Sequence, residues 1–210
     1  MVAASDVTLI LLAAGRSERF GGAESKLDED LWGRPLGLHV VHALRELPFA
    51  ARIAVTGRCR IDYAAEGFAV VRNDAPEVGL SGSLRIGVGH AVERGARAVL
   101  IVLADMPCVT AAHVRRLMDA GDTADAVIAS TDGTTPRPPV LFGRHYLRAL
   151  TTLSGDAGAR AMIRAGRHIV ADAGELIDVD TVADLERLRK SRRWPDSGLG
   201  RMHGTPCTGG

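Results

Sequence analysis

Several features are scarce in this chain of 210 residues, and each absence excludes a class of protein. Aromatic residues make up only 4%, so the rows of stacking rings that bind single-stranded nucleic acid are lacking. The three cysteines lie far apart without a Cys-x-x-Cys pair, which excludes a disulfide framework and favours a reducing cytoplasm. No apolar run is long enough for a membrane span or a signal peptide. With a net charge of +1, the chain lacks the basic excess typical of nucleic-acid binding.

Charge is distributed unevenly along the chain. Residues from Arg189 onward carry a net charge of +4, whereas residues 1–188 carry −3. The stretch after Trp194 is also rich in Gly, Pro, Ser and Thr, which is typical of a flexible chain end. We therefore predict one domain over residues 1–191 and a flexible basic tail over residues 192–210.

Apolar runs alternate with helical patterns along most of the chain. The strongest runs, Val7–Ala14 and Ala98–Leu103, are continuous, as in strands that are buried on both faces. Further strands are expected at Arg52–Thr56, Ala69–Arg72, Ala126–Ala129, Val140–Phe142, Ile169–Val170 and Ile177–Val179. Helices are expected at Leu36–Leu47, Ser83–Ala91, Ala111–Ala120, Asp156–Ala165 and Val182–Lys190. The alternation predicts a three-layer α/β/α fold with a doubly wound, mostly parallel sheet, whose ligands bind beyond the carboxyl ends of the strands.

A glycine-rich loop follows the first expected strand, with the sequence Leu12-Ala-Ala-Gly-Arg-Ser-Glu-Arg-Phe-Gly-Gly22. Its small residues let backbone amides approach an anion closely, and Arg16, Arg19 and Lys26 can add positive charge. The loop matches neither the P-loop nor the Gly-x-Gly-x-x-Gly pattern of dinucleotide-binding proteins. It predicts phosphate binding, and a glycine-rich turn with surface arginines is the alternative.

Two later segments are also suited to chemistry. In Leu103-Ala-Asp-Met-Pro107 an aspartate follows a buried strand, and one carboxylate together with substrate phosphates is a usual way to hold Mg²⁺. An aspartate in an ordinary turn is the alternative. The hydroxyls of Ser81 and Ser83 suit the edges of a nucleobase, and serine is equally favoured as a helix N-cap.

Two aspartate-containing segments each precede an expected helix. Asp156, in Leu153-Ser-Gly-Asp-Ala-Gly-Ala-Arg160, suits a helix cap. In Ile177-Asp-Val-Asp-Thr181, either Asp180 or Thr181 would cap the last helix. If this segment is a strand, Asp178 points to the face opposite Asp180.

Taken together, these segments resemble the nucleotidyltransferases that activate molybdenum cofactor. That family carries Leu-Ala-Ala-Gly-x-Ser-x-Arg-x-Gly, then a lysine, then Gly-x-Pro-Leu, and here Lys26 and Gly33-Arg-Pro-Leu36 follow the first loop. The resemblance covers roughly residues 7–190 in five ordered motifs. It implies the nucleotidyltransferase variant of the α/β fold, which is similar to nucleotide-diphospho-sugar transferases.

The resemblance implies a role for each matched position. Arg19, Lys26 and Asp105 would be catalytic, and Asp105 and Asp180 would hold Mg²⁺. The resemblance implies that the nucleotide would be bound by Leu12, Ala13, Ala14, Gly15, Arg16, Ser17, Asn73, Ser81, Gly82 and Ser83. Those facing the second substrate would be Arg137, Gly155 and Asp156.

Two details resemble the cytidylyl-transferring branch of the family, namely Ala-Ala-Gly in the first loop and Met106 after Asp105. The implied reaction joins CTP to molybdopterin-bound molybdenum cofactor and releases pyrophosphate, and a molybdoenzyme would receive the product. The branch usually carries Gly-His where Arg137-Pro138 stand here, which is the clearest departure. Three alternatives therefore stay open: the same reaction with GTP, a different phosphorylated acceptor, and a non-catalytic cofactor carrier.

Overall fold

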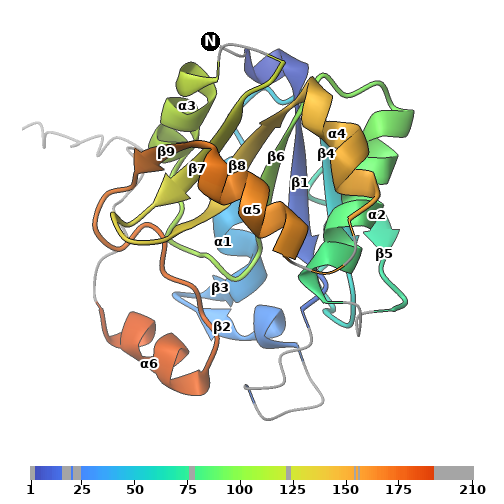
Figure 1. Cartoon of the computed structure of the whole chain (residues 1–210). Helices are drawn as coiled ribbons and strands as arrows, with labels where there is room; N and C mark the ends of the chain where they lie inside the picture. Colours follow the sequence, from blue (N-terminus) through green and yellow to red (C-terminus); the bar gives the residue numbers. More distant parts are fainter. Residues whose placement is uncertain are drawn as a thin grey trace, which may run out of the picture.

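The computed structural model describes residues 3–15, 20, 25–75, 79–121, 124–153, 155 and 157–191. Its centre is a seven-stranded sheet with the strand order β5-β4-β1-β6-β8-β7-β9 (Figure 1). The strands are β1 (Val7–Ala13), β4 (Ala51–Thr56), β5 (Ala69–Arg72), β6 (Ala98–Leu103), β7 (Val127–Thr131), β8 (Pro136–Gly143) and β9 (Arg167–Val170). Strand β8 runs antiparallel to β6 and β7, and the other neighbouring pairs are parallel. The predicted mostly parallel sheet is thus confirmed.

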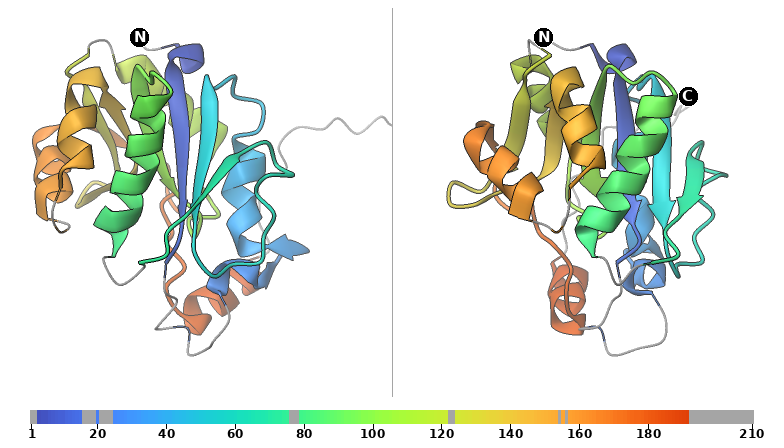
Figure 2. Two further views of the ribbon diagram at one scale, coloured as in Figure 1. Left: turned by 90° about the vertical axis from the view of Figure 1, so that its right-hand side faces the viewer. Right: turned by 45° about the vertical axis from the view of Figure 1, so that its right-hand side comes forward.

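Helices cover both faces of this sheet (Figures 1 and 2). One face carries α2 (Leu80–Glu93), α4 (Arg144–Thr151) and α5 (Ala157–Ala165), and the other carries α1 (His39–Ala43) and α3 (Ala111–Ala120). Side chains alternate along each strand, so Ile10 packs toward the α2 face while Leu9 packs toward α1 and α3. Burial on both faces explains the continuous apolar runs and confirms the three-layer architecture.

A smaller group of elements lies beyond the carboxyl ends of β1 and β6 (Figure 2). It contains η3 (Lys26–Asp28), β2 (Asp30–Leu31), β3 (Arg34–Pro35), η4 (Leu36–Leu38) and α6 (Val182–Lys190), while η1 (Ala4–Asp6) precedes β1. Leu185 and Leu188 of α6 pack with Leu31 and Leu36 in a cluster of their own. This packing holds the end of the described chain against residues that follow the first loop.

Two expectations about secondary structure need correction, and one helix was not expected. The helix expected at Leu36–Leu47 is a 3-10 turn followed by a short α1 that ends at Ala43, although the apolar stripe is buried as expected. No strand forms at Ile177–Val179, which lies in an irregular loop. Helix α4 was not anticipated from the sequence.

Strand β8 contains several prolines although it is not an edge strand. Strand β8 lies between β6 and β7, but its pairing with β6 begins only at Val140. Pro136 therefore pairs with β7 alone, at Thr131, and a register shift follows at Ser130. The prolines thus lie where one side of the strand needs no backbone donors.

Candidate active site

Three segments that are distant in sequence meet beyond the carboxyl ends of β1 and β6. Lys26 begins η3, Asp105 follows β6, and Asp180 lies just before α6. The ammonium nitrogen of Lys26 lies 2.7 Å from Oδ2 of Asp105 and 3.2 Å from Oδ1 of Asp180, and it donates to the carbonyl oxygen of Val179 at 2.7 Å. The structure therefore brings together three of the residues that the sequence singled out.

Local backbone contacts fix these side chains. The Ser25 hydroxyl accepts from the amide of Leu27 and caps the 3-10 turn that carries Lys26. The amide of Val179 donates to the carbonyl oxygen of Asp105 at 3.0 Å, which joins the two carboxylate-bearing segments. Thr181, one of the two expected caps, caps α6 in a capping box with Asp184.

A third carboxylate belongs to this cluster. Carboxylate oxygens of Asp105, Asp178 and Asp180 lie within 4.8 Å of one another. The expectation that Asp178 points away from Asp180 was wrong, because their segment is a loop without the alternation of a strand. The three aspartates come from the segments that a parallel sheet places at one edge, where ligands are expected.

The electrostatics of the cluster fit a divalent cation. Burial, together with the carboxylates of Asp105 and Asp180, raises the pKa of Asp178 to about 7. Oδ1 of Asp105 and Oδ1 of Asp178 are buried, and neither has a hydrogen-bond partner among the described residues. Carboxylate oxygens are the ligands that Mg²⁺ and similar hard cations prefer, so a bound cation would satisfy both atoms.

Lys26 supplies positive charge to the same cluster. Burial lowers the pKa of Lys26, but the neighbouring Asp105, Asp178 and Asp180 more than offset this effect and hold the pKa above its ordinary value. The lysine is therefore fully charged at neutral pH. Its charge lies where it neutralises the neighbouring carboxylates.

A buried glutamate anchors the loop that carries two of the carboxylates. Glu175 is only 8% exposed, accepts from the hydroxyl of Thr110, and accepts from the amide of Asp172 at 2.9 Å. Thr110 caps α3, the helix that follows Asp105. No motif in the sequence pointed to Glu175, because its partner lies 65 residues earlier in the chain.

The first part of the expected phosphate loop ends β1 and borders a small cavity. Leu12, Ala13 and Ala14 are buried at the end of β1, and Gly15 lines a cavity of about 160 Å³ together with Gly57 and Asn73. A side chain at Gly57 would lie 3.2 Å from the Cα of Ala14, so glycine permits the close approach of β1 and β4 here. Arg16, Ser17 and Arg19 were also expected here, but they lie outside the described residues.

Asn73 and the serines of α2 form the next wall. The Asn73 amide donates to the Ser83 hydroxyl at 3.0 Å, and its oxygen accepts from the amide of Ala75. Ser81, Gly82 and Ser83 are buried in the first turns of α2, which begins at Leu80 after Gly79, so neither serine caps the helix. Ser83 instead holds the loop after β5 against α2.

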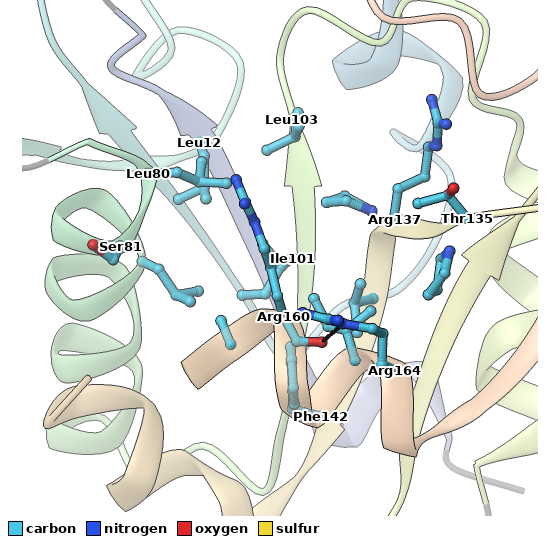
Figure 3. A pocket seen from close by; sticks show the side chains of 16 residues that line it. Leu12, Leu80, Ser81, Ile101, Leu103, Thr135, Arg137, Phe142, Arg160 and Arg164 are labelled. Atoms are coloured by element: carbon cyan, nitrogen blue, oxygen red, sulfur yellow. Dashed lines mark hydrogen bonds between the residues drawn. The ribbon is translucent and has the colours of Figure 1, made fainter. Parts of the chain in front are cut away.

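A larger cavity of about 450 Å³ lies on the α2 and α5 face of the sheet (Figure 3). Arg137, expected to face the second substrate, lines it and also pairs with Asp132 at 3.1 Å. Two arginines of α5 that sequence reasoning did not select, Arg160 and Arg164, line it as well. Gly155 has the positive φ of a turn glycine, and Asp156 lies outside the described residues.

Comparison with known sequences places this site among nucleotidyltransferase domains. The profile of the MobA-like NTP transferase domain family matches residues 9–171. Purine catabolism protein PucB of Bacillus subtilis is 28% identical over 200 residues, covering 87% of this chain and 95% of PucB. Bifunctional protein GlmU of Sphingopyxis alaskensis is 29% identical over 147 residues, 66% of this chain, and the match spans only 31% of GlmU.

Several solved structures are similar to this chain in both fold and sequence. A homologue of Mycobacterium tuberculosis Rv0371c from Mycobacterium sp. strain JC1 is 31% identical with a TM-score of 0.72, over 88% of this chain and 96% of that one. A nucleotidyl transferase from Methanothermobacter, Mth528, is 25% identical with a TM-score of 0.74, over 87% and 95% of the two chains. Rv0371c itself, 26% identical with a TM-score of 0.70 over 88% and 98%, was solved as a complex with manganese. Within the described part of the present chain, no helix is long and apolar enough to cross a membrane.

Proposed function

Because the chain belongs to the MobA-like NTP transferase domain family, we propose that it is a nucleotidyltransferase that moves a cytidylyl group from CTP to molybdopterin-bound molybdenum cofactor and releases pyrophosphate. The observation that carries the proposal is the convergence of Lys26 with Asp105 and Asp180 at the carboxyl edge of the sheet. A molybdoenzyme would receive the product.

In this mechanism the protein aligns two substrates and neutralises their charge. The attacking group is the terminal phosphate of the cofactor, which is already ionised, so no general base is required. Asp105 and Asp180, with Asp178 beside them, would hold Mg²⁺, which when bound neutralises charge on the α-phosphate of CTP and on the attacking phosphate.

Lys26 pairs with Asp105 and Asp180 in the structure. In this scheme its ammonium group would stabilise charge on the α-phosphate and on the departing pyrophosphate. Arg19 is proposed to add a second positive charge to the phosphates. Positioning and charge neutralisation of this kind can supply most of the rate enhancement of a phosphoryl-type transfer.

The small cavity beside Gly15 and Asn73 is proposed to hold the nucleotide, with Leu12, Ala13, Ala14, Arg16 and Ser17 around its phosphates. Ser81 and Gly82 border the base from α2 in the same proposal. Ala14 and Met106 support cytosine over guanine, because they match the cytidylyl-transferring branch. A transferase for a different phosphorylated acceptor is the second candidate, since Arg137-Pro138 replaces Gly-His in a segment that lines the larger cavity.

The test is pyrophosphate release with Mg²⁺, molybdenum cofactor and each of CTP, GTP, ATP and UTP in turn. We expect release with CTP alone, and we expect Asp105→Ala to lower it at least about 1,000-fold while Asp119→Ala, an exposed aspartate on α3, has no effect. Release with GTP instead of CTP would show that GTP is the nucleotide substrate. Full activity of Asp105→Ala would refute the mechanism.

A further inference from the structure

The imidazole of His113 lies within a buried chain of hydrogen bonds between α3 and the sheet. The side chains of His113 and of Ser130 on β7 are both fully buried. Nε2 of His113 lies 2.7 Å from the Ser130 hydroxyl, which donates to the carbonyl oxygen of Pro139 on β8 at 2.8 Å. Because serine has one hydroxyl proton and gives it to Pro139, Nε2 is the donor to Ser130. The first ring nitrogen thus connects α3 to β7 and, through Ser130, to β8.

The second ring nitrogen faces the loop between β9 and α6, residues 171–181, here called the carboxylate loop. Nδ1 accepts from the guanidinium of Arg116 at 3.0 Å, and this guanidinium lies 3.6 Å from Oε2 of Glu175. Nδ1 itself lies 3.8 Å from the same oxygen. Oε2 also accepts from the amide of Asp172 at 2.9 Å, near the start of the carboxylate loop. The ring of His113 is therefore neutral and lies between β7 and the carboxylate loop.

Both ends of this chain of contacts lead to the proposed metal site. Ser130 pairs with Arg137 in the sheet, at the register shift of β7. Arg137 lies near enough to Asp178 for its charge to lower the pKa of that carboxyl, although burial and the other carboxylates dominate. At the other end, the carboxylate loop supplies both Asp178 and Asp180. Contacts that meet at His113 thus help to fix the position of Arg137 relative to the carboxylates.

A second proton on the ring is incompatible with these contacts. At Nδ1 it would face the guanidinium of Arg116, and Glu175 is the carboxylate that could accept it. Oε2 would have to move toward the ring and away from the Asp172 amide that it holds. The charged groups that act on His113 are Arg116 on its own helix and Glu175 and Asp172 of the carboxylate loop, whereas β7 presents the uncharged Ser130. Protonation would therefore loosen the start of the carboxylate loop.

We propose that His113 is a positioning residue for the metal site: its neutral ring holds the carboxylate loop in place relative to β7 and β8, and its protonation releases the loop. This inference rests on the proposed function, because the site on which His113 acts is the proposed metal site. It gives that site a sensitivity to acid that comes from a residue outside the proposed ligands Asp105, Asp178 and Asp180.

Mn²⁺ binding at different pH values tests the protonation step without any turnover. Electron paramagnetic resonance gives the Mn²⁺ affinity between pH 7.5 and 5 for the unaltered protein, for His113→Gln and for His168→Gln, an exposed histidine on β9. The glutamine amide keeps a donor for Ser130 but takes up no proton in this range. We expect the affinity of the unaltered protein and of His168→Gln to fall at least about tenfold more than that of His113→Gln. The three carboxylates are present in all three proteins, so their own titration does not produce this difference.

Hydrogen exchange tests the connection between β7 and the carboxylate loop in the metal-free protein at pH 7.5. Among the described residues, the Ser130 hydroxyl has hydrogen-bond contacts with His113 and Pro139 alone. Ser130→Ala should nevertheless lower the protection of the Asp172 amide at least about fivefold, because His113 loses the acceptor that orients its ring. Ile128→Val is the matched control, since it removes one buried methyl group from the same strand. It should leave the protection of Asp172 unchanged.

Each measurement can overturn the inference independently. Equal pH dependence of Mn²⁺ affinity in the unaltered protein and His113→Gln would do so. Unchanged protection of Asp172 in Ser130→Ala would do so as well, and that measurement does not depend on the folding of His113→Gln. Absence of Mn²⁺ binding at every pH would refute both the metal site and this role of His113. A pH profile that depends on His113, without pyrophosphate release from any nucleotide, would refute the proposed reaction and leave the role of His113 intact.

Discussion

Glu175 accepts a hydrogen bond from the Thr110 hydroxyl, and this contact ties the loop of Asp178 and Asp180 to the helix that follows Asp105. The three carboxylates are thus held together by two connections. One is the backbone contact between Val179 and Asp105, and the other is this buried side-chain contact. Glu175 is therefore a positioning residue for the proposed metal site.

Glu175→Ala should weaken the metal site by loosening its loop. We expect Mn²⁺ affinity, followed by electron paramagnetic resonance, to fall several-fold, and the free energy of unfolding to fall by about 1–3 kcal/mol as buried donors lose their acceptor. Glu175→Gln keeps one acceptor oxygen and should recover part of both losses. Glu186→Ala, on the surface of α6, serves as the control. A loss of stability without any change in Mn²⁺ affinity would show that Glu175 does not position the carboxylates.

Lys26→Met should make folding depend on a divalent cation. Without the ammonium group three neighbouring carboxylates repel one another, and we expect the free energy of unfolding to fall by about 2–4 kcal/mol. This range is set below that of a fully buried pair because the Asp180 side chain is 46% exposed. Thermal unfolding with and without Mn²⁺ should show a larger metal-induced stabilisation in the variant than in the unaltered protein.

The chain offers a matched control for this prediction. Lys190 is its only other lysine, and it is exposed on α6. Lys190→Met should leave both the stability and its response to Mn²⁺ unchanged. If Lys26→Met and Lys190→Met respond equally to the metal, the electrostatic coupling between Lys26 and the carboxylates is negligible.

Two glycines of α2 should respond in opposite directions to the same substitution. A Cβ at Gly87 would lie 2.6 Å from Cγ2 of Ile10, so Gly87→Ala should destabilise the protein by about 1–3 kcal/mol through overpacking against β1. Gly89 has open space around it, and Gly89→Ala should stabilise α2 by about 0.4–1 kcal/mol. Urea unfolding measures both values, and destabilisation by Gly89→Ala would contradict the packing described for this helix.

A buried histidine should make stability sensitive to acid. Nε2 of His113 lies 2.7 Å from the Ser130 hydroxyl, which itself donates to the carbonyl oxygen of Pro139, so Nε2 carries the proton and Nδ1 accepts from Arg116. Burial lowers the pKa of His113, and the neutral form is the one that fits these contacts.

The sign of the effect follows from proton uptake. The unfolded chain binds a proton at this histidine near pH 6.5, whereas the folded protein does so only at lower pH. The contribution of His113 to the free energy of unfolding should therefore be greatest above about pH 6.5 and should decrease as the pH falls through that value. Urea unfolding between pH 7.5 and 5 should show a smaller decrease for His113→Gln than for the unaltered protein or for His168→Gln, an exposed histidine. Equal slopes in all three proteins would contradict this account.

The strands and part of the site could be predicted from the sequence because their signals are local. Continuous apolar runs such as Val7–Ala13 indicate a strand buried on both faces. Asp105 directly follows such a strand, and the topology of a parallel sheet then determines which edge it occupies. Local signals gave only a positive charge for Lys26 and a possible helix cap for Asp180, and their catalytic and metal-binding roles were expected from resemblance to a family pattern.

Other parts of the site depend on tertiary structure that local patterns do not specify. The side chain of Asp178 was expected to point away from Asp180 because apolar and polar residues alternate in this segment as they do in a strand. The segment is instead a loop, which is held by contacts of Glu175 and Val179. Arg160 and Arg164 have a helical spacing that the sequence does contain, but nothing in it shows that this side of α5 faces a cavity. Gly57 likewise matters only because β1 and β4 approach each other closely.

The loop between β9 and α6 has a consequence for the order in which the molecule is completed during synthesis. All seven strands have been made once the chain reaches Val170, and the family profile ends at residue 171, yet Asp178 and Asp180 come later. A growing chain can thus possess its entire sheet, together with Lys26 and Asp105, while two of the three carboxylates are still missing. Capacity to bind a cation would therefore arise only after the sheet is complete, when the loop crosses back from β9 at the sheet edge to Asp105 near its centre.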